Sequence, residues 1–432
     1  MKAQGMENQK TIAPLSPELF RTNRRRLLES MVQGEGLLHS SNARMHRNGD
    51  QYFSYRQHSG FYYLSGIRQA ESLLLLSHNR QVLFLQKPSP LTELWDGAVM
   101  KQEEAAWLSG MDEIRWLEEL PEVLEEVLGP VSRLYMNYSG GAEADYFPDR
   151  DLYRKLKKRW PGVERLSADP LLMRLRMVKQ DLEVEAMRKS IAISAAAFRR
   201  VLSEVRPLMR EFEVEARLGS VFRSMGASGH AFEPILATGA NALVLHYIQN
   251  DGVCREGDLL LMDFGAELNC YAADCSRTIP VSARYSDRQR RVYDATCRVF
   301  LAARDMMRPG AALKELHAEV GALWEKEHID LGLYSMADAR KADSDSPLWK
   351  RYYPHGTSHS LGLDVHDPFE RDAVLTKGMV LTCEPGIYIR EEAMGIRLEN
   401  DILIGSEGPE DLMENIPMEA EEIETLMQEG RR

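Results

Sequence analysis

The sequence has few of the features that mark a secreted or membrane protein. Its 432 residues include only five cysteines, an odd number, and no two of them form a C-x-x-C pair. A disulfide framework is therefore not expected, and a reducing compartment suits the chain best. The polar segment 1–14 lacks the apolar centre of a secretory signal, and no apolar run approaches the roughly 20 residues that a membrane-spanning helix needs. We expect a cytoplasmic protein that does not bind a membrane.

An excess of basic charge is also missing. Lys and Arg total 54 against 66 Asp and Glu, which gives a formal net charge of −12. Because an acidic surface repels phosphate backbones, nucleic acid is not an expected partner. Short-period repeats and low-complexity tracts are absent from the sequence as well. With 44% hydrophobic and 28% charged residues, the composition is that of a globular protein, and this length favours two domains.

The pattern of elements changes along the chain. In residues 1–172, short apolar runs at 72–76 and 82–86 and an amphipathic helix at 121–128 predict an α/β domain. Residues 173–432 predict an α+β domain, because long helices from Asp181 onward are followed by short strands. The expected strands of this second domain are 235–238, 243–246, 258–266, 278–280, 379–384, 395–398 and 400–404. The polar stretch 331–350 is expected to be an irregular surface insertion.

Two aspartates stand close together in the second domain. Asp263 ends the apolar run 259–262, and Asp274 follows eleven positions later. Antiparallel strands joined by a hairpin would place these carboxylates side by side, where like charges repel strongly in a low dielectric. A bound cation would remove that repulsion. On this pair alone, two unrelated surface aspartates are an equally good interpretation.

A histidine-rich segment follows about 80 residues later in the domain. His355, His359 and His366 are three of only 11 histidines in the chain, and they lie in a glycine-containing stretch. A single histidine is more often a structural hydrogen-bonding residue, whereas three together predict a functional site.

Two glutamates complete this set of polar residues. Glu384 follows the apolar run 379–382 in a Cys-Glu-Pro-Gly sequence, and Glu399 shares one face of a strand with Arg397. Four carboxylates and one imidazole form an oxygen-rich set, which suits Mn²⁺ or a similar ion better than a structural zinc. Their negative charge predicts two divalent ions, held about 3.5–4 Å apart with a shared hydroxide as nucleophile.

The order of these motifs resembles the pita-bread metallopeptidases, the family that includes aminopeptidase P, prolidase, methionine aminopeptidase and creatinase. Segments 47–50 and 56–66 resemble the N-terminal domain of aminopeptidase P. The resemblance covers the chain from residue 20 to Ile423, except for 331–350. It implies a creatinase and aminopeptidase P type α/β domain in residues 1–172, followed by a pita-bread catalytic domain in residues 173–432.

The resemblance also implies a role for each residue of the predicted site. Asp263 would bind one ion, Asp274 and Glu399 would bridge both ions, and His359 and Glu384 would complete the other. Glu384 would also act as the general base.

The resemblance further implies substrate contacts. His246 would contact the substrate, and His366 would stabilise the carbonyl region and the developing oxyanion. Trp95 resembles a tryptophan that a neighbouring subunit presents to the active site, and the family suggests a homodimer or homotetramer. The pocket for a proline ring would be formed by Phe232, His355 and Arg397.

The activity implied is hydrolysis of the first peptide bond when proline stands at the second position. That bond is a tertiary amide without an N–H, and a metal centre polarises its carbonyl without needing such a donor. Two alternatives stay open: a prolidase, which accepts only Xaa-Pro dipeptides, and a non-catalytic pita-bread scaffold that binds proteins.

A serine hydrolase is disfavoured, because Ser358 stands beside His359 without a G-x-S-x-G motif. Ser360 and the segment 368–370 depart from the family pattern near the expected cleft, which leaves fine specificity open.

Overall fold

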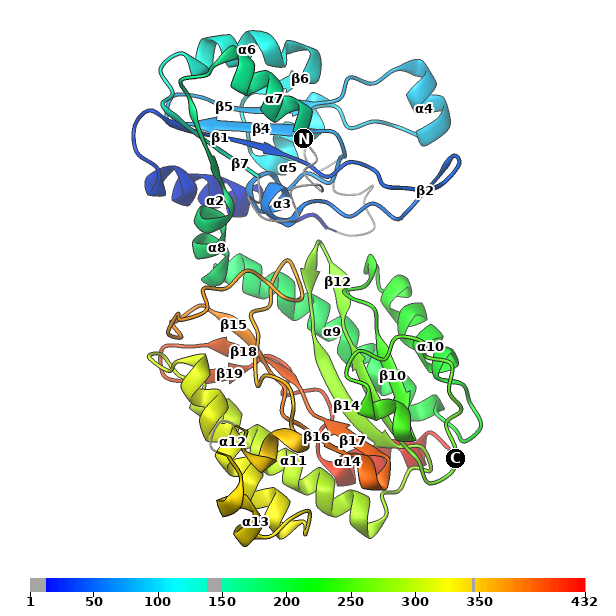
Figure 1. Cartoon of the computed structure of the whole chain (residues 1–432). Helices are drawn as coiled ribbons and strands as arrows, with labels where there is room; N and C mark the ends of the chain where they lie inside the picture. Colours follow the sequence, from blue (N-terminus) through cyan, green and yellow to red (C-terminus); the bar gives the residue numbers. More distant parts are fainter. Residues whose placement is uncertain (1–12, 138–149, 344–345, 432) are drawn as a thin grey trace. The chain divides into compact units, whose positions relative to one another are not determined.

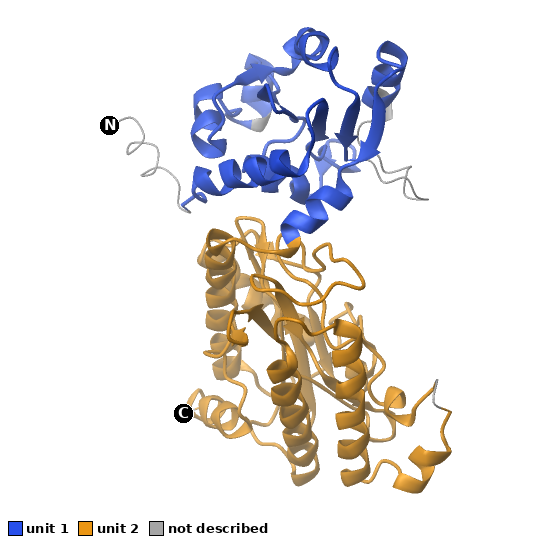
Figure 2. Ribbon diagram, turned by 90° about the vertical axis from the view of Figure 1, so that its left-hand side faces the viewer, with its two compact units in different colours: residues 1–176 blue, residues 177–432 orange. Residues whose placement is uncertain are grey.

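The computed structural model describes residues 13–137, 150–343 and 346–431. The chain divides into two compact units, unit 1 (Met1–Arg176) and unit 2 (Met177–Arg432) (Figure 2). The boundary predicted after residue 172 lies inside helix α8 (Asp169–Met177), at whose end the two units meet in the sequence. All five cysteines are buried free thiols. None of the helices in the described ranges combines the length and the apolar character that crossing a membrane requires.

Unit 1 is built on a mixed sheet with the strand order β6-β5-β4-β1-β7-β8. Strand β1 pairs antiparallel with β4 and parallel with β7, so the sheet changes direction at its centre. The continuous apolar sequence of β4 fits this central position, because every residue of the strand is buried. The six strands are β1 (Glu35–Ser40), β4 (Leu73–Ser77), β5 (Gln81–Leu85), β6 (Ile114–Trp116), β7 (Arg133–Met136) and β8 (Glu164–Ser167).

Helices cover this sheet and confirm the predicted α/β pattern. Residues of α6 such as Val123 and Leu124 pack on Leu75 and Phe84 of the sheet in one apolar cluster, whereas α2 packs on α3, α5 and β4. The helices are α2 (Pro17–Ser30), α3 (Ser59–Ser65), α4 (Pro90–Asp96), α5 (Gln102–Ser109), α6 (Leu120–Leu128) and α7 (Arg150–Arg159), and a small hairpin joins β2 (His46–Asn48) to β3 (Gln51–Tyr52).

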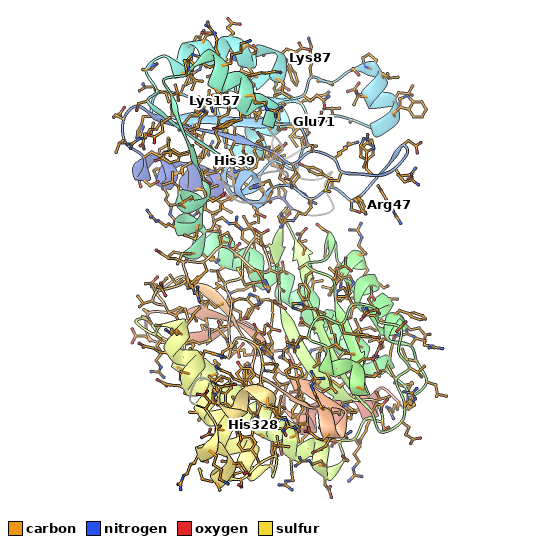
Figure 3. All side chains as sticks on the ribbon, viewed as in Figure 1. His39, Arg47, Glu71, Lys87, Lys157 and His328 are labelled. Atoms are coloured by element: carbon orange, nitrogen blue, oxygen red, sulfur yellow. The ribbon has the colours of Figure 1, made fainter. Side chains whose placement is uncertain are left out.

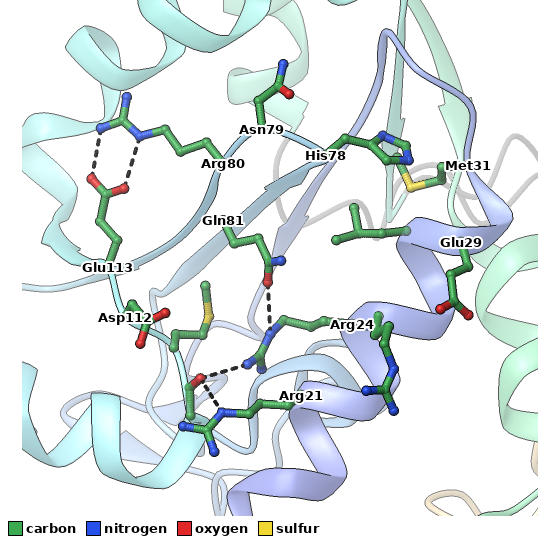
Figure 4. A pocket seen from close by; sticks show the side chains of 14 residues that line it. Arg21, Arg24, Glu29, Met31, His78, Asn79, Arg80, Gln81, Asp112 and Glu113 are labelled. Atoms are coloured by element: carbon green, nitrogen blue, oxygen red, sulfur yellow. Dashed lines mark hydrogen bonds and ion pairs between the residues drawn. The ribbon is translucent and has the colours of Figure 1, made fainter.

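A buried arginine of α2 fastens the ends of two helices in unit 1. Arg24 donates to the carbonyl of Leu64 in the last turn of α3 (2.8 Å) and to that of Gly110, which ends α5 (3.2 Å). Its Nε also donates to Gln81 (3.3 Å), and Arg21 shares the Gly110 carbonyl (3.1 Å) (Figure 4). Burial lowers the pKa of Arg24 to about 10. The carbonyls at a helix C-terminus carry partial negative charge, and they therefore stabilise this buried cation.

Unit 2 begins with two long helices, as the sequence predicts. Helix α9 (Asp181–Glu204) buries the expected apolar face, including Met187, Ile191 and Phe198, and α10 (Glu211–Ser224) packs against it. Figure 1 shows α9 and α10 beside β12 and β10, while α11 and α12 lie on another side of the unit. The further helices are α11 (Asp287–Met306), α12 (Leu313–Asp330), α13 (Met336–Lys341) and α14 (Ala420–Glu429).

The strands found in the described residues of unit 2 form four small antiparallel sheets. Their orders are β10-β11-β14, β13-β12-β9, β15-β18-β19 and β16-β17. The strands are β9 (Gly229–His230), β10 (Ile235–Thr238), β11 (Leu259–Phe264), β12 (Ala266–Leu268), β13 (Tyr271–Ala272), β14 (Cys275–Pro280), β15 (Val380–Cys383), β16 (Gly386–Ile389), β17 (Met394–Arg397), β18 (Asn400–Ile404) and β19 (Pro409–Asp411).

Two local predictions for unit 2 were wrong. Residues 243–246 are not a strand: the 3₁₀ helix η3 (Gly239–Leu243) is followed by a turn at 245–246. The backbone N–H of Val244 bonds to the carbonyl of Asn241 (3.1 Å) at the end of this 3₁₀ helix rather than to a neighbouring strand, although the sequence is apolar. The insertion at 331–350 is not irregular throughout, because its polar residues form the exposed helix α13.

Each unit also encloses a fully buried histidine, His39 in unit 1 and His328 in unit 2 (Figure 3). The ring of His328 stacks on that of Trp324 at 5.2 Å between centroids. Burial lowers the pKa of His328 to about 3. This histidine is therefore neutral in the folded protein, although the unfolded chain would protonate it in mild acid.

Candidate metal centre

The β11–β14 pair brings the two aspartates together. Asp263 on β11 faces Ser276 of β14 in the antiparallel register, and Asp274 stands just before β14. Gly265 makes this close approach possible, since a Cβ at that position would lie 1.7 Å from the carbonyl oxygen of Ala273. The predicted hairpin arrangement of the carboxylates is therefore present.

The histidine and the first glutamate come from a loop and a strand that run side by side. The backbone of His359 bonds with Thr382 of β15, and Glu384 stands just beyond the end of that strand. These bonds hold the His359 Nε2 atom 3.5 Å from Asp274 Oδ2 and 3.6 Å from Glu384 Oε1.

The second glutamate, Glu399, lies between β17 and β18. Its Oε2 accepts a hydrogen bond from the Ser276 hydroxyl (2.7 Å), and that hydroxyl accepts one from Arg397 Nε (2.8 Å). Arg397 also forms an ion pair with Asp263 at 2.6 Å. Asp274, His359 and Glu399 each offer a ligand atom within 4.8 Å of the others.

A buried arginine fixes the backbone that carries Glu399. Arg277, wholly inaccessible to solvent, donates to the carbonyl oxygen of Glu399 (2.8 Å) and to the side chain of Asn400 (2.7 Å). It also donates to the carbonyl of Pro417 (2.9 Å). One guanidinium thereby ties β14 to the start of β18 and to the segment before α14.

The electrostatics of this cluster favour a cation. Burial, together with the carboxylates of Glu399 and Asp263, raises the pKa of Asp274 well above its usual value. Burial raises the pKa of Glu384 to about 8, and burial with the neighbouring Glu384 raises that of Glu399. The Oδ1 atoms of Asp263 and Asp274 are buried without a hydrogen-bond partner among the described residues. Buried acceptors in mutual repulsion are the features that a divalent ion would compensate.

Two histidines of the cluster, His359 and His355, are uncharged. Burial lowers the pKa of His359 to about 4, with a further contribution from His366, whose ring centroid lies 4.2 Å away. Burial lowers the pKa of His355 to about 3. A neutral imidazole is the form that binds a metal, so His359 fits a ligand role.

These residues line one cleft of about 480 Å³ in unit 2. The structure therefore brings together every residue of the predicted site except Trp95, which belongs to unit 1, where it is 79% exposed on α4. The predicted residues lining the cleft are Phe232, His246, Asp263, Asp274, His355, His359, His366, Glu384, Arg397 and Glu399.

The sequence alone did not predict two apolar residues of the cleft, or a tyrosine that bonds to two of the residues lining it. Leu245 and Ile248 give it an apolar wall beside His246. The hydroxyl of Tyr388 bonds with His355 and Arg397, both at 2.9 Å. The apolar residues next to His246 in the sequence could have predicted an apolar wall of the cleft. A tyrosine within a buried strand gives no such indication.

The unusual Ser360 has a partner of its own. Its hydroxyl lies 3.4 Å from Lys179 Nζ, which also forms an ion pair with Asp367 at 3.4 Å. The hydroxyl of Ser358, the residue next to His359, is buried and has no hydrogen-bond partner in the described part of the chain. A Ser–His pair of the serine-hydrolase type is therefore not formed.

Known proteins resemble the chain over nearly its full length. Residues 185–406 match the profile of metallopeptidase family M24, and residues 20–135 match the aminopeptidase P N-terminal domain. The Xaa-Pro aminopeptidase of Escherichia coli K12 is 31% identical, with 98% of this chain and 100% of that protein covered. The Xaa-Pro aminopeptidase of Haemophilus influenzae is also 31% identical, with coverage of 96% and 98%.

Solved structures agree with these sequence matches. E. coli aminopeptidase P with the inhibitor Pro-Leu is 30% identical and superposes with a TM-score of 0.87, with 97% of this chain and 100% of that chain covered. An aminopeptidase of Pseudomonas aeruginosa is 32% identical, with a TM-score of 0.88 and coverage of 98% and 100%. The predicted fold, an aminopeptidase P type α/β domain followed by a pita-bread domain, is confirmed.

Proposed function

We propose, from the premise that this chain belongs to metallopeptidase family M24, that it removes the first residue from peptides whose second residue is proline. One observation carries this proposal. The carboxylate and imidazole cluster lines the same cleft as the side chains expected to contact a proline. Relatives named Xaa-Pro aminopeptidase support it. So does an E. coli aminopeptidase P bound by the inhibitor Pro-Leu, a dipeptide that begins with proline.

The proposed cofactor is a pair of Mn²⁺ ions. Four carboxylates exceed the charge of one divalent ion, and their oxygens suit Mn²⁺. Such ions, when bound, supply Lewis-acid catalysis. The residues that would hold them are Asp263, Asp274, His359, Glu384 and Glu399.

The proposed chemistry of the chain centres on Glu384. Its carboxylate would accept the proton of the attacking water and pass it to the departing prolyl nitrogen. His366, beside His359, would donate a hydrogen bond to the developing oxyanion. His246, which lines the same cleft, would contact the substrate.

The proline ring would be bound by Phe232, His355 and Arg397. Arg397 already pairs with Asp263, and its other contacts include Ser276 and Tyr388. Its charge is therefore compensated inside the protein. We infer that Arg397 contributes shape and a rigid wall to this pocket, and not an unpaired charge that would attract an acidic substrate.

We also propose a cytoplasmic homodimer or homotetramer. Leu91, Leu94 and Trp95 of α4 are 65%, 79% and 79% exposed, and exposed apolar side chains that cluster on one short helix favour burial against a second copy. The test is the molar mass in solution of the wild type and of Trp95→Ala. A monomeric wild type would contradict the proposal.

A series of substrates tests the activity. Metal-stripped protein, with and without added Mn²⁺, would be assayed on Xaa-Pro, Xaa-Pro-Yaa and Xaa-Pro-Yaa-Zaa. We expect cleavage of the longer peptides, only with metal. Cleavage of the dipeptide alone would indicate a prolidase. A protein that binds no Mn²⁺ and cleaves nothing would indicate a scaffold.

A pair of matched variants tests the general base. Glu384→Gln should lose activity, while Glu391→Gln, a surface change in the same unit where Glu391 pairs with Arg351, should keep it. Full activity of Glu384→Gln would show that the base is another residue.

A further inference from the structure

The wall of the cleft that carries His246 is a segment with little regular structure, residues 239–252. It consists of η3, a turn at 245–246 and irregular backbone from Tyr247 to Asn250, which has a left-handed φ of 49°. Leu245, His246 and Ile248 line the cleft, while residues 239–242 and 251–252 line a separate hollow of about 600 Å³. Because both the cleft and the hollow border this segment, side-chain packing covers only part of it. Hydrogen bonds must therefore hold much of its backbone in place.

Those hydrogen bonds converge on one carboxylate outside the cleft. Glu211, the first residue of α10, is 0% exposed. Its Oε1 accepts from the backbone N–H of Thr238 (2.7 Å), the Thr238 hydroxyl (2.8 Å) and the Asn241 amide (3.0 Å). Its Oε2 accepts from the Tyr247 hydroxyl (2.8 Å) and the backbone N–H of Gly252 (2.7 Å). The carboxylate thus holds both ends of the segment and its middle.

The hydrogen bond from Tyr247 to Glu211 lies next to His246, the residue proposed to contact the substrate. Tyr247 is buried in a small apolar cluster with Ala242 and Tyr388, and the adjacent His246 is exposed toward the cleft. Burial and the hydrogen bond to Glu211 both raise the pKa of Tyr247, so its hydroxyl keeps the proton that it donates. Fixing the phenol of Tyr247 therefore fixes the backbone from which the imidazole of His246 projects.

We infer that Glu211 is a positioning residue of the peptidase, which acts through Tyr247 to hold His246 in place for the substrate. This inference rests on the proposed function. An amide cannot replace the carboxylate, because each Glu211 oxygen accepts from a backbone N–H. Whichever way a glutamine is turned, its NH₂ group faces one of those donors.

Kinetics of the metal-loaded enzyme test the inference. A hydrogen bond to a charged group contributes about 1.5–3 kcal/mol, so Glu211→Gln should lower kcat/KM by roughly 10-fold or more, with metal content unchanged. The matched control is Glu215→Gln, one turn further along α10, where an amide oxygen can still accept the single bond from Asn250. That control should retain kcat/KM to within about two-fold.

A double-mutant cycle separates positioning from general damage. In a His246→Ala background, Glu211→Gln should change kcat/KM by less than about two-fold, because the residue through which it acts is already gone. Three results would overturn the inference. The first is an equally large loss of kcat/KM when Glu211→Gln is added to His246→Ala. The others are full activity of Glu211→Gln alone, or a loss of its bound metal. Should Glu211→Gln fail to fold, Tyr247→Phe replaces it in the cycle. It must then lower kcat/KM in the wild type but not in the His246→Ala background.

Hydrogen exchange supplies a test that needs no activity. Amides of residues 239–252, and that of Thr238 at the end of β10, should exchange faster in Glu211→Gln than in the wild type, with the strands of unit 2 other than β10 unchanged. Unchanged exchange of the segment would overturn the inference. If the wild type instead fails to cleave Xaa-Pro peptides, the proposed function fails, and exchange still reports whether Glu211 holds this wall.

Discussion

Removing the hydroxyl of Ser276 should weaken metal binding while the protein remains folded. This hydroxyl is fully buried, donates to Glu399 and accepts from Arg397. Ser276→Ala therefore frees one oxygen of a candidate ligand and leaves a guanidinium N–H unpaired. The carboxylate of Glu399 gains freedom to rotate, and the ion must restrain it again on binding.

The magnitude follows from the bonds that are lost. A hydrogen bond to a charged group contributes about 1.5–3 kcal/mol, which corresponds to roughly 10- to 100-fold in a binding constant. Changes to residues that orient metal ligands weaken metal affinity by about the same factor. We therefore expect the dissociation constant for Mn²⁺ to rise by roughly 10- to 100-fold in Ser276→Ala.

The assay is a competition titration with a chelator of known affinity. Ser190→Ala is the control, because Ser190 is equally buried in the same unit and its hydroxyl donates to the carbonyls of Tyr271 (2.9 Å) and Ala186 (3.4 Å), away from the candidate ligands. Both variants should lose some thermal stability, but only Ser276→Ala should lose affinity for Mn²⁺. Equal affinities in the two variants would refute the role given to this hydroxyl.

Three further outcomes are expected. Chelation of the metal should lower the melting temperature, because an ion at about 100 times its Kd stabilises the folded state by ~2.7 kcal/mol; a melting temperature independent of Mn²⁺ would argue against a metal centre. Since the folded state leaves His328 unprotonated while the unfolded state protonates below about pH 6.5, stability should fall by ~2 kcal/mol on acidification to about pH 5. Urea titrations at several pH values should show that His328→Phe removes this part of the pH dependence of the unfolding free energy. The same pH dependence in the variant and the wild type would contradict the prediction. Arg24→Met should destabilise unit 1 by about 2–4 kcal/mol in the same assay without changing the metal content of unit 2, and an unchanged midpoint would show that its carbonyl contacts contribute nothing.

Sequence motifs and the family resemblance were sufficient to select the candidate metal ligands of the cleft. Each candidate ligand stands at or near the end of an apolar strand or in a glycine-containing loop, and such places are visible without a structure. The β11–β14 pairing follows from the apolar run of β11 and the short strand predicted at 278–280, which the structure extends back to Cys275. Because the strand period is two, this pairing also places the two aspartates close to one another.

The residues that support the cleft could not be predicted in the same way. Tyr247 and Glu211 are 36 positions apart, and their bond depends on the path of a segment without regular structure. The run 243–246 was predicted to be a strand because it is apolar. In the folded chain, Tyr247 and the donors to Glu211 decide its conformation instead, and no local pattern records a carboxylate elsewhere in the sequence.

The guanidinium of Arg277 has a consequence for the order in which the molecule is assembled. It meets the carbonyl of Glu399 across 122 positions, so the strand that presents this glutamate joins the sheet only after most of unit 2 has been synthesised. A nascent chain that has just passed β14 contains two of the five candidate ligands, Asp263 and Asp274. The proposed ion site is thus complete only in the finished molecule.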